Sequence, residues 1–180
     1  RNNLEALACL FKITRVKAFD IYPEIAERFA EEMKEVVRVD IEVVKKPKEA
    51  VVGLDLVVTS GPILKNPSPV IEADWLAEGA FASPVDFDSY WKGEALRQAD
   101  KLATDDIDQM EYYRKTGYFK NTPQPYADLG AIVSGRKPGR EKAEERTICI
   151  NLGIALDDMA TAILIYKKAG EEGIGTRLPL

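Results

Sequence analysis

Histidine is absent from this sequence of 180 residues, and cysteine occurs only twice. Without an imidazole, the chain holds neither a Ser-His-Asp nor a Cys-His catalytic group, and it offers no histidine ligand to a catalytic zinc ion. Proton transfer must therefore use carboxylates, lysines, tyrosines or the substrate itself. Cys9 and Cys149 each lie in an apolar segment, which is typical of buried, reduced thiols in a cytosolic protein.

Long apolar runs and a strong excess of one charge are also missing. No apolar run has the length of a bilayer span, and no signal-peptide pattern opens the sequence. The net charge is −5, and the lysines are scattered among acids, so no basic patch indicates a nucleic-acid partner. A hydrophobic content of 46% is ordinary for a globular protein with one substantial core. We expect a cytoplasmic protein that binds neither nucleic acid nor a membrane, with no metal site.

Apolar strand segments alternate with helical segments along the chain. Strands are predicted at residues 16–20, 37–43, 54–59, 80–85, 102–104 and 147–151. Helices are predicted at residues 4–11, 23–33, 47–51, 71–77, 88–98, 107–116 and 126–134, with a last helix that begins at Asp157 and Asp158. This alternation predicts the α/β class, with a Rossmann-like, doubly wound parallel sheet that helices cover on both faces.

The opening strand of such a sheet is missing from the pattern. In a dinucleotide-binding βαβ unit, the acid that binds the ribose follows the glycine-rich turn by about 20 residues. Counting back from Asp20 ends at Arg1 or just before it. We therefore expect an NAD-binding domain over residues 1–152, truncated at its first strand and glycine-rich turn, and a carboxy-terminal helix and tail over residues 153–180. An incompletely resolved chain, a proteolysed protein or a split gene would each give this pattern.

Polar residues at two strand ends are candidate cofactor contacts. Asp20 ends a predicted strand, where a carboxylate can accept both hydrogen bonds of an adenosine ribose and repel a 2′-phosphate, which favours NAD over NADP. Alternatively, Asp20 stabilises the dipole of the helix that begins at Pro23. Thr59 and Ser60 end another buried strand, where their hydroxyls would face the crevice that binds cofactors. An ordinary turn would carry the same two residues.

The stretch from Ala127 to Gly175 joins a glycine loop, an apolar strand and a helix that begins with paired carboxylates. It reads ADLGAIVSGRKPGR, then TICINLGIALDDMATA, and closes on Gly173-Ile174-Gly175-Thr176. This block resembles the carboxy-terminal signature of the ornithine cyclodeaminase and mu-crystallin family. The resemblance implies a nicotinamide-dependent protein that acts on or binds amino acids or cyclic imines, and a homodimer formed through a domain absent from this chain.

Residues 79–88, which read GAFASPVDFD, resemble the family stretch that contacts the substrate amine. Laid without gaps, the family's aspartate falls on Asp88, and a lysine four residues later falls on Lys92; the resemblance makes both catalytic. Asp86 stands where the family usually has glycine and remains an alternative to Asp88. A capping pair before a helix would also explain the two aspartates.

The resemblance also assigns residues to the cofactor. Val85 and Asp86 join Asp20, Thr59 and Ser60 in this set. Asn151 belongs to it as well, standing where the family usually has a serine near the nicotinamide. The aromatic residues Phe87, Tyr90 and Trp91 depart from the small residues usual in the family, which leaves the substrate class open.

Ornithine cyclodeaminase chemistry is the activity that the resemblance favours. NAD takes a hydride from ornithine, the imine cyclises with loss of ammonia, and the hydride returns to give proline. A carboxylate at Asp88 would accept the proton of the nitrogen and stabilise the cationic imine in a dry pocket. Alanine dehydrogenase or ketimine reductase activity would need the same aspartate, and a non-catalytic, mu-crystallin-like cofactor binder is a further alternative. Because the family places its ligands for the substrate carboxylate in an amino-terminal domain, this chain alone is expected to be inactive.

Overall fold

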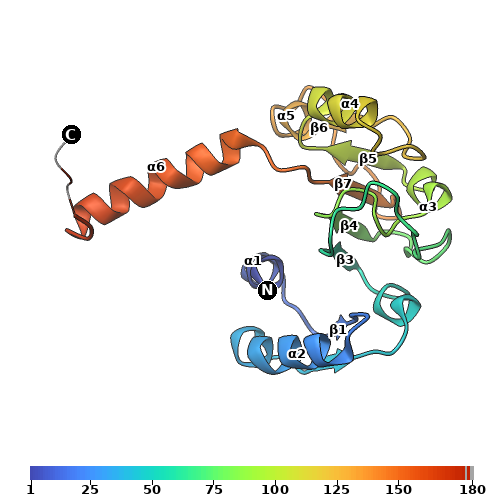
Figure 1. Ribbon diagram of the computed structural model, residues 1–180, viewed down its shortest axis with the longest axis horizontal. Helices are drawn as coiled ribbons and strands as arrows, with labels where there is room; N and C mark the ends of the chain where they lie inside the picture. The colour runs from blue at the N-terminus through green and yellow to red at the C-terminus, as the bar shows by residue number, and fades with distance from the viewer. Residues whose placement is uncertain (177, 179–180) are drawn as a thin grey trace.

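The structure, a computed structural model, describes residues 1–176 and 178, which form two parallel sheets connected by helices (Figure 1). Strands β1 (Val16–Ala18) and β2 (Ile41–Val43) form the small sheet, with Val16 paired to Ile41. The larger sheet has the strand order β3-β4-β7-β5-β6. Every strand pair is parallel, which requires crossover connections and agrees with the predicted α/β class.

In the part of the chain that the structure describes, the larger sheet consists of five short strands. From one edge to the other they are β3 (Leu56–Thr59), β4 (Phe81–Pro84), β7 (Thr147–Ile150), β5 (Lys101–Thr104) and β6 (Ala127–Asp128). The helices are α1 (Asn2–Leu10), α2 (Pro23–Val37), α3 (Gly93–Arg97), α4 (Ile107–Lys115), α5 (Leu129–Val133) and α6 (Ala155–Glu171), with a 3₁₀ helix η1 (Pro47–Ala50). Helices α1 and α2 lie with the small sheet, and α6 extends away from the larger sheet (Figure 1).

Helix α2 illustrates how local sequence determines an element. Pro23 stands in its first turn, where a missing N–H leaves no hydrogen bond unmade. Ala26 and Met33 are its buried residues, so one face of the helix packs inward. The helix ends at Arg38, whose φ of 55° is left-handed, and Lys34 pairs with Asp40 at 2.8 Å across this turn. The chain thereby reverses into strand β2.

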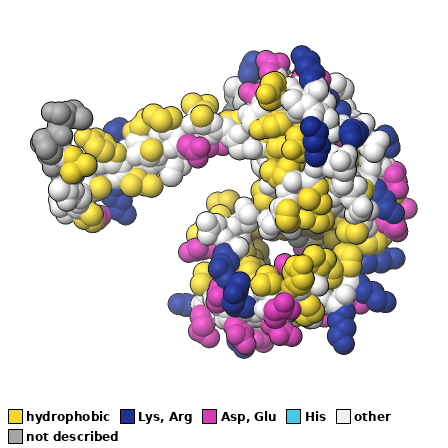
Figure 2. Space-filling model, viewed as in Figure 1, with side chains coloured by type: hydrophobic (Ala, Val, Ile, Leu, Met, Phe, Trp, Pro, Cys, Tyr) yellow, Lys and Arg dark blue, Asp and Glu magenta, His cyan; other side chains and the backbone are white. Residues whose placement is uncertain are grey.

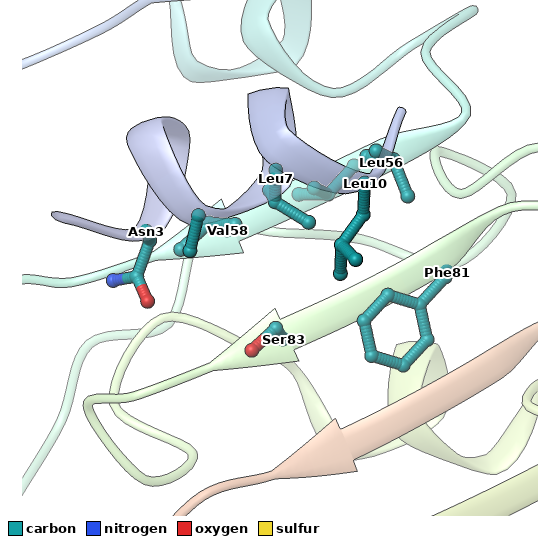
Figure 3. Close-up of a pocket in the computed structure, with 9 residues that line it drawn as sticks. Asn3, Leu7, Leu10, Leu56, Val58, Phe81 and Ser83 are labelled. Atoms are coloured by element: carbon teal, nitrogen blue, oxygen red, sulfur yellow. The ribbon is translucent and has the colours of Figure 1, made fainter. Parts of the chain in front are cut away.

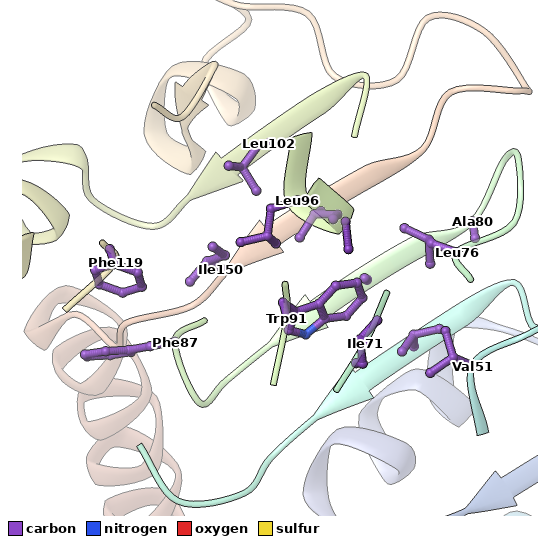
Figure 4. Close-up of a cluster of buried hydrophobic side chains, with 14 of the residues drawn as sticks. Val51, Ile71, Leu76, Ala80, Phe87, Trp91, Leu96, Leu102, Phe119 and Ile150 are labelled. Atoms are coloured by element: carbon purple, nitrogen blue, oxygen red, sulfur yellow. The ribbon is translucent and has the colours of Figure 1, made fainter. Parts of the chain in front are cut away.

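The hydrophobic core lies in the larger sheet and the segments that cover it (Figure 4). Ala82 and Ile150, on the central strands β4 and β7, are 0% exposed. Such burial is expected of parallel strands that are covered on both faces. The cluster also includes larger side chains from loops and helices that follow β4: Phe87, Trp91, Leu96, Met110 and Phe119.

Several predicted boundaries are wrong. Residues 71–77 form turns rather than a helix, because Ile71 makes an isolated parallel bridge with Trp91 and Asp74 adopts a φ of 66°. The predicted helix 88–98 is only Gly93–Arg97, since turns precede it. The predicted strand 37–43 shortens to β2 because α2 continues through Val37, and the predicted helix 126–134 begins with strand β6.

Helix α6 projects from the larger sheet and exposes apolar side chains. In helix α6, all of whose residues are described, none is buried, and Leu156, Leu164 and Tyr166 are 72%, 68% and 81% exposed. Figure 2 shows hydrophobic side chains along this projecting helix.

Cys149 is buried as expected, whereas Cys9 is exposed, contrary to the prediction, because α1 has no buried residue. No helix within residues 1–176 combines the length and apolarity that a membrane span needs.

A cavity of about 130 Å³ separates α1 from strands β3 and β4. Leu7 and Leu10 of α1 face Val58, Phe81 and other apolar residues across it (Figure 3). Its lining is mainly apolar, and Asn3 and Ser83 are the polar residues among those that form it. The cavity therefore reflects incomplete packing of α1 on the sheet.

Candidate functional site

The carboxyl ends of β3, β4 and β7 lie side by side. The N–H of Val85 donates to the carbonyl of Thr59 at 2.9 Å, and the N–H of Asn151 donates to the carbonyl of Pro84 at 2.8 Å. Three of the predicted cofactor residues, Thr59, Val85 and Asn151, are therefore neighbours at one edge of the sheet. In open parallel sheets this edge is where ligands bind. Ser60, the next residue after β3, is exposed there.

Asp86 is completely buried and ties the loop after β3 to the turn after β4. Its Oδ1 accepts a hydrogen bond from Thr59 Oγ1 at 2.8 Å, and its Oδ2 accepts one from the N–H of Gly61 at 2.9 Å. Trp91 Nε1 donates to Thr59 Oγ1 at 3.1 Å, so this hydroxyl is already used on both sides. Burial raises the pKa of Asp86, and the bonds from Gly61 and Thr59 oppose that shift. These contacts favour a structural role for the Asp86 carboxylate.

Asp88 lies on the same turn but contacts a different part of the chain. It is 8% exposed, and its Oδ2 accepts a hydrogen bond from Thr122 Oγ1 at 2.7 Å. Phe87, between the two aspartates, has a φ of 61°, which is rare for a bulky residue and reverses the backbone there. The Phe87 ring packs on Tyr113 and Phe119 at centroid distances of 4.9 and 4.8 Å, and this packing fixes the turn. Thr122 was not predicted, because 34 residues separate it from Asp88.

Lys92 contacts an acid on the surface. Its Nζ pairs with Glu72 Oε1 at 2.7 Å, and its side chain is 33% exposed. The hydrogen bond that Lys92 donates to Glu72 raises the pKa of Lys92, so the amine is held in its charged form. None of the hydrogen bonds among residues 1–176 joins Lys92 to Asp88, so the two predicted catalytic residues do not form a pair.

Asp20 follows β1 on the small sheet. Its Oδ1 accepts a hydrogen bond from the N–H of Tyr22 at 2.9 Å, just before α2. Burial, the charge of Asp86 and the charge of Asp20 together raise the pKa of Tyr90. Its ring packs over Gly61, where an added Cβ would lie 2.5 Å from Cζ. This contact was not predicted, because the aromatic residue at position 90 had only left the substrate class open.

The Asn151 side chain bridges two strands. Its Nδ2 donates to Ser83 Oγ at 2.9 Å and to the carbonyl of Cys149 at 3.0 Å. The two residues after it donate their backbone N–H groups to Asp105, an acid that follows β5. Asp105 was not among the predicted residues. Its position directly after a buried strand is the sequence signal that could have identified it.

Comparison with known proteins decides the family. A sequence model described as the ornithine cyclodeaminase/mu-crystallin family matches residues 1–173. The chain belongs to this family. The carboxy-terminal signature and the resemblance of residues 79–88 had both pointed to it, and the Rossmann-like fold of its solved members is the fold described above.

The curated relatives of the chain include dehydrogenases, reductases and an uncharacterised cyclodeaminase. It is 29% identical to alanine dehydrogenase of Archaeoglobus fulgidus, over 97% of this chain and 55% of that protein. It is 33% identical to N-((2S)-2-amino-2-carboxyethyl)-L-glutamate dehydrogenase of Staphylococcus aureus, over 93% of this chain and 51% of that protein. The chain thus spans about half the length of the curated relatives it matches.

Among solved structures, a reductase and a dehydrogenase have a similar fold. The Δ(1)-pyrroline-2-carboxylate reductase of Thermococcus litoralis, in complex with NADH and L-proline, superposes with a TM-score of 0.82 at 30% identity. That match covers 98% of this chain and 56% of the other. An archaeal alanine dehydrogenase dimer with bound NAD superposes with a TM-score of 0.80 at 26% identity, over 99% of this chain and 56% of the other.

Proposed function

We propose that this chain is the nucleotide-binding part of an NAD-dependent enzyme that acts on the carbon–nitrogen bond of an amino acid or its imine. One observation carries the proposal. At the carboxyl edge of a parallel sheet, the predicted contact Val85 bonds Thr59 through the backbone, and the predicted contact Asn151 bonds Pro84, the neighbour of Val85. Family membership and relatives that bind NAD or NADH supply the chemistry. The geometry of this sheet edge alone would fit any nucleotide. Family membership narrows the proposed ligand to a nicotinamide cofactor.

The residues at this edge fit a dinucleotide. Ser60 is exposed directly after β3, whereas the Thr59 hydroxyl is used by Asp86 and Trp91. Asp20, at the end of β1, would accept the hydrogen bonds of the adenosine ribose and disfavour a 2′-phosphate. Val85 and Asn151 would line the nicotinamide end, with Asp86 holding the loop behind them. When bound, NAD would supply the hydride acceptor.

Asp88 is the proposed acid–base residue. Thr122 occupies its Oδ2, and no hydrogen bond to its Oδ1 is found among the described residues, so one oxygen is left to meet a substrate nitrogen. A carboxylate in this position would accept a proton from the nitrogen and stabilise a cationic imine. Lys92 remains a proposed catalytic residue from the family match; its pairing with Glu72 favours an electrostatic role over proton transfer.

The proposed division into residues 1–152 and residues 153–180 follows the shape of α6. This helix leaves the sheet with no buried residue and with exposed apolar side chains, as expected of an element that packs on another domain. A homodimer is proposed because a related alanine dehydrogenase is a dimer. We also propose a cytoplasmic location, in keeping with a buried reduced thiol at Cys149.

Two finer activities compete. Ornithine cyclodeaminase-like chemistry, in which hydride transfer is followed by return of the hydride, is the activity that the sequence resemblance favours. Net hydride transfer, as in an alanine dehydrogenase or a ketimine reductase, is favoured by the names of the relatives, which include alanine dehydrogenase and Δ(1)-pyrroline-2-carboxylate reductase. A mu-crystallin-like binder that holds the cofactor without turnover is the non-enzymatic alternative.

The stoichiometry of reduced cofactor to ammonia separates these activities. The whole protein is mixed with NAD and ornithine, alanine or proline, and separately with NADH and a cyclic imine. NADH absorbance and released ammonia are then followed. Net dehydrogenation accumulates NADH with substrate loss, whereas a cyclodeaminase releases ammonia while NADH stays near zero. Cofactor binding without turnover of any substrate would contradict the enzymatic proposal.

Two variants assign the acid. Asp88→Asn should lower kcat by at least about a hundredfold, the usual contribution of a positioned acid or base, while NADH affinity stays within about twofold. Asp108→Asn, at an exposed acid of α4, is the matched control and should keep full activity. An active Asp88→Asn protein would move the assignment to another group.

A further inference from the structure

Asp105 is a buried carboxylate that the proposed reaction does not use. It follows β5 and is 8% exposed. Its Oδ2 accepts hydrogen bonds from the consecutive backbone N–H groups of Leu152 and Gly153, both at 2.7 Å. Its Oδ1 accepts hydrogen bonds from the N–H of Asp106 at 3.0 Å and from Thr104 Oγ1 at 3.2 Å. Charge-assisted bonds of this kind are about twice as strong as neutral ones.

The segment of residues 152 and 153, which Asp105 binds, also accepts a hydrogen bond from a second side chain. Gln109, on α4, donates from its Nε2 to the carbonyl of Gly153 at 3.1 Å. Gly153 has a φ of 83°, a conformation that residues with a Cβ rarely adopt, so a glycine is required at this turn. Helix α4 itself is capped by Asp106, whose Oδ1 accepts a hydrogen bond from the N–H of Gln109 at 2.7 Å. The turn after β7 is thus fixed to the start of α4.

Two functional parts of the chain meet at this turn. Before it stands Asn151, whose amide already bonds Ser83. After it begins α6, which has no buried residue of its own. Within the described residues, the contacts of Asp105 and Gln109 with residues 152 and 153, together with the packing of Leu152 on the core, therefore anchor α6 on the sheet. Burial and then the charge of Asp105 raise the pKa of the Cys149 thiol to about 12, which places this charge close to β7.

We propose that Asp105 is a positioning residue that fixes the turn between β7 and α6. Through this turn it sets the direction in which α6 leaves the sheet, and it holds Asn151 at the carboxyl edge. The effect on Asn151 rests on the proposed cofactor function. The effect on α6 does not, since it follows from hydrogen bonds within the protein alone.

The direction of α6 can be measured without a cofactor. Spin labels are attached in the whole protein at Val133→Cys, which is 86% exposed, and at Lys168→Cys, a charged residue of α6 whose side chain is 72% exposed, in a Cys9→Ser background. Distances between the labels are measured by double electron–electron resonance. Asp105→Ala should broaden the distance distribution at least twofold, and Asp105→Asn, which keeps one acceptor oxygen, should broaden it less. Asp108→Asn removes the same charge from an exposed site on α4 and should leave it unchanged.

Cofactor affinity is measured on the same variants by NADH fluorescence. Asp105→Ala should raise the Kd for NADH by about tenfold, the loss expected for one misplaced hydrogen-bonding contact. If that variant does not fold, Gln109→Ala replaces it, because it removes only the bond to Gly153. Unchanged label distances in a folded Asp105→Ala protein would overturn the proposal. A broadened distribution with unchanged NADH affinity would overturn its cofactor part. Failure of the wild-type protein to bind NADH would refute the proposed function and leave the α6 anchor supported.

Discussion

Gly61→Ala should destabilise the protein through the ring of Tyr90. A Cβ at position 61 would lie 2.5 Å from Tyr90 Cζ and 2.7 Å from Cε2, distances at which atoms overlap. Displacement of the half-buried ring would break the contact of its hydroxyl with the carbonyl of Pro62, which is 3.4 Å away. Moving the loop instead would stretch the bond from the N–H of Gly61 to Asp86. Overpacking of this kind costs about 1–3 kcal/mol, and the flexible end of the tyrosine places the expected loss near 1–2 kcal/mol.

The sharper quantity is the coupling between positions 61 and 90. Without the ring, in a Tyr90→Ala background, the added methyl group of Gly61→Ala meets no overlap and should cost almost nothing. The double-mutant cycle, measured by urea unfolding, should therefore give a coupling of about 1–2 kcal/mol. Gly170→Ala, where a Cβ meets only open space at the end of α6, is the control and should be neutral or stabilising by up to about 1 kcal/mol. A coupling below about 0.5 kcal/mol would refute the contact.

Three further outcomes follow from buried groups. Burial raises the pKa of Asp86 above its ordinary value of 3.8, so the free energy of unfolding should fall as pH rises from 3.8 through the raised pKa of the folded state. In urea titrations, Asp86→Asn should flatten this dependence of unfolding free energy on pH. An unchanged slope would contradict the raised pKa. With a pKa of about 12, Cys149 should resist a thiol reagent at pH 8 while exposed Cys9 reacts, so two fast thiols before denaturation would contradict its burial. Ile150→Ala should cost about 2–5 kcal/mol in the same unfolding assay, since Ile150 is 0% exposed; a loss below about 1 kcal/mol would contradict its place in the core.

The alternation of strands and helices was predictable because each element carries its own apolar period. Strands near residues 16–20, 54–59, 80–85 and 147–151 were all found, with shorter bounds. The segment 71–77 misled the prediction because its apolar residues are buried by a bridge to Trp91 and by turns rather than along a helix face. Cys9 misled it as well, because the apolar stretch around it lies on a helix with no buried residue.

The candidate site was predictable only where a local rule applies. Parallel strands end at one edge, so Thr59, Val85 and Asn151 could be expected to meet there, and their backbone bonds confirm that they do. Contacts between distant segments follow no local period. Thr122 reaches Asp88 across 34 residues and Asp105 reaches Leu152 across 47, so neither could be paired from sequence alone.

The most direct test of the account is a titration of the whole protein with NADH and with NADPH, followed by nicotinamide fluorescence. We predict saturable binding of NADH at one site per chain, with NADPH weaker by at least about tenfold because Asp20 repels the 2′-phosphate. Asp20→Ala should reduce that preference, whereas Asp40→Ala, at an exposed acid of the turn before β2, should keep it. Binding of neither cofactor, or tighter binding of NADPH, would contradict the account.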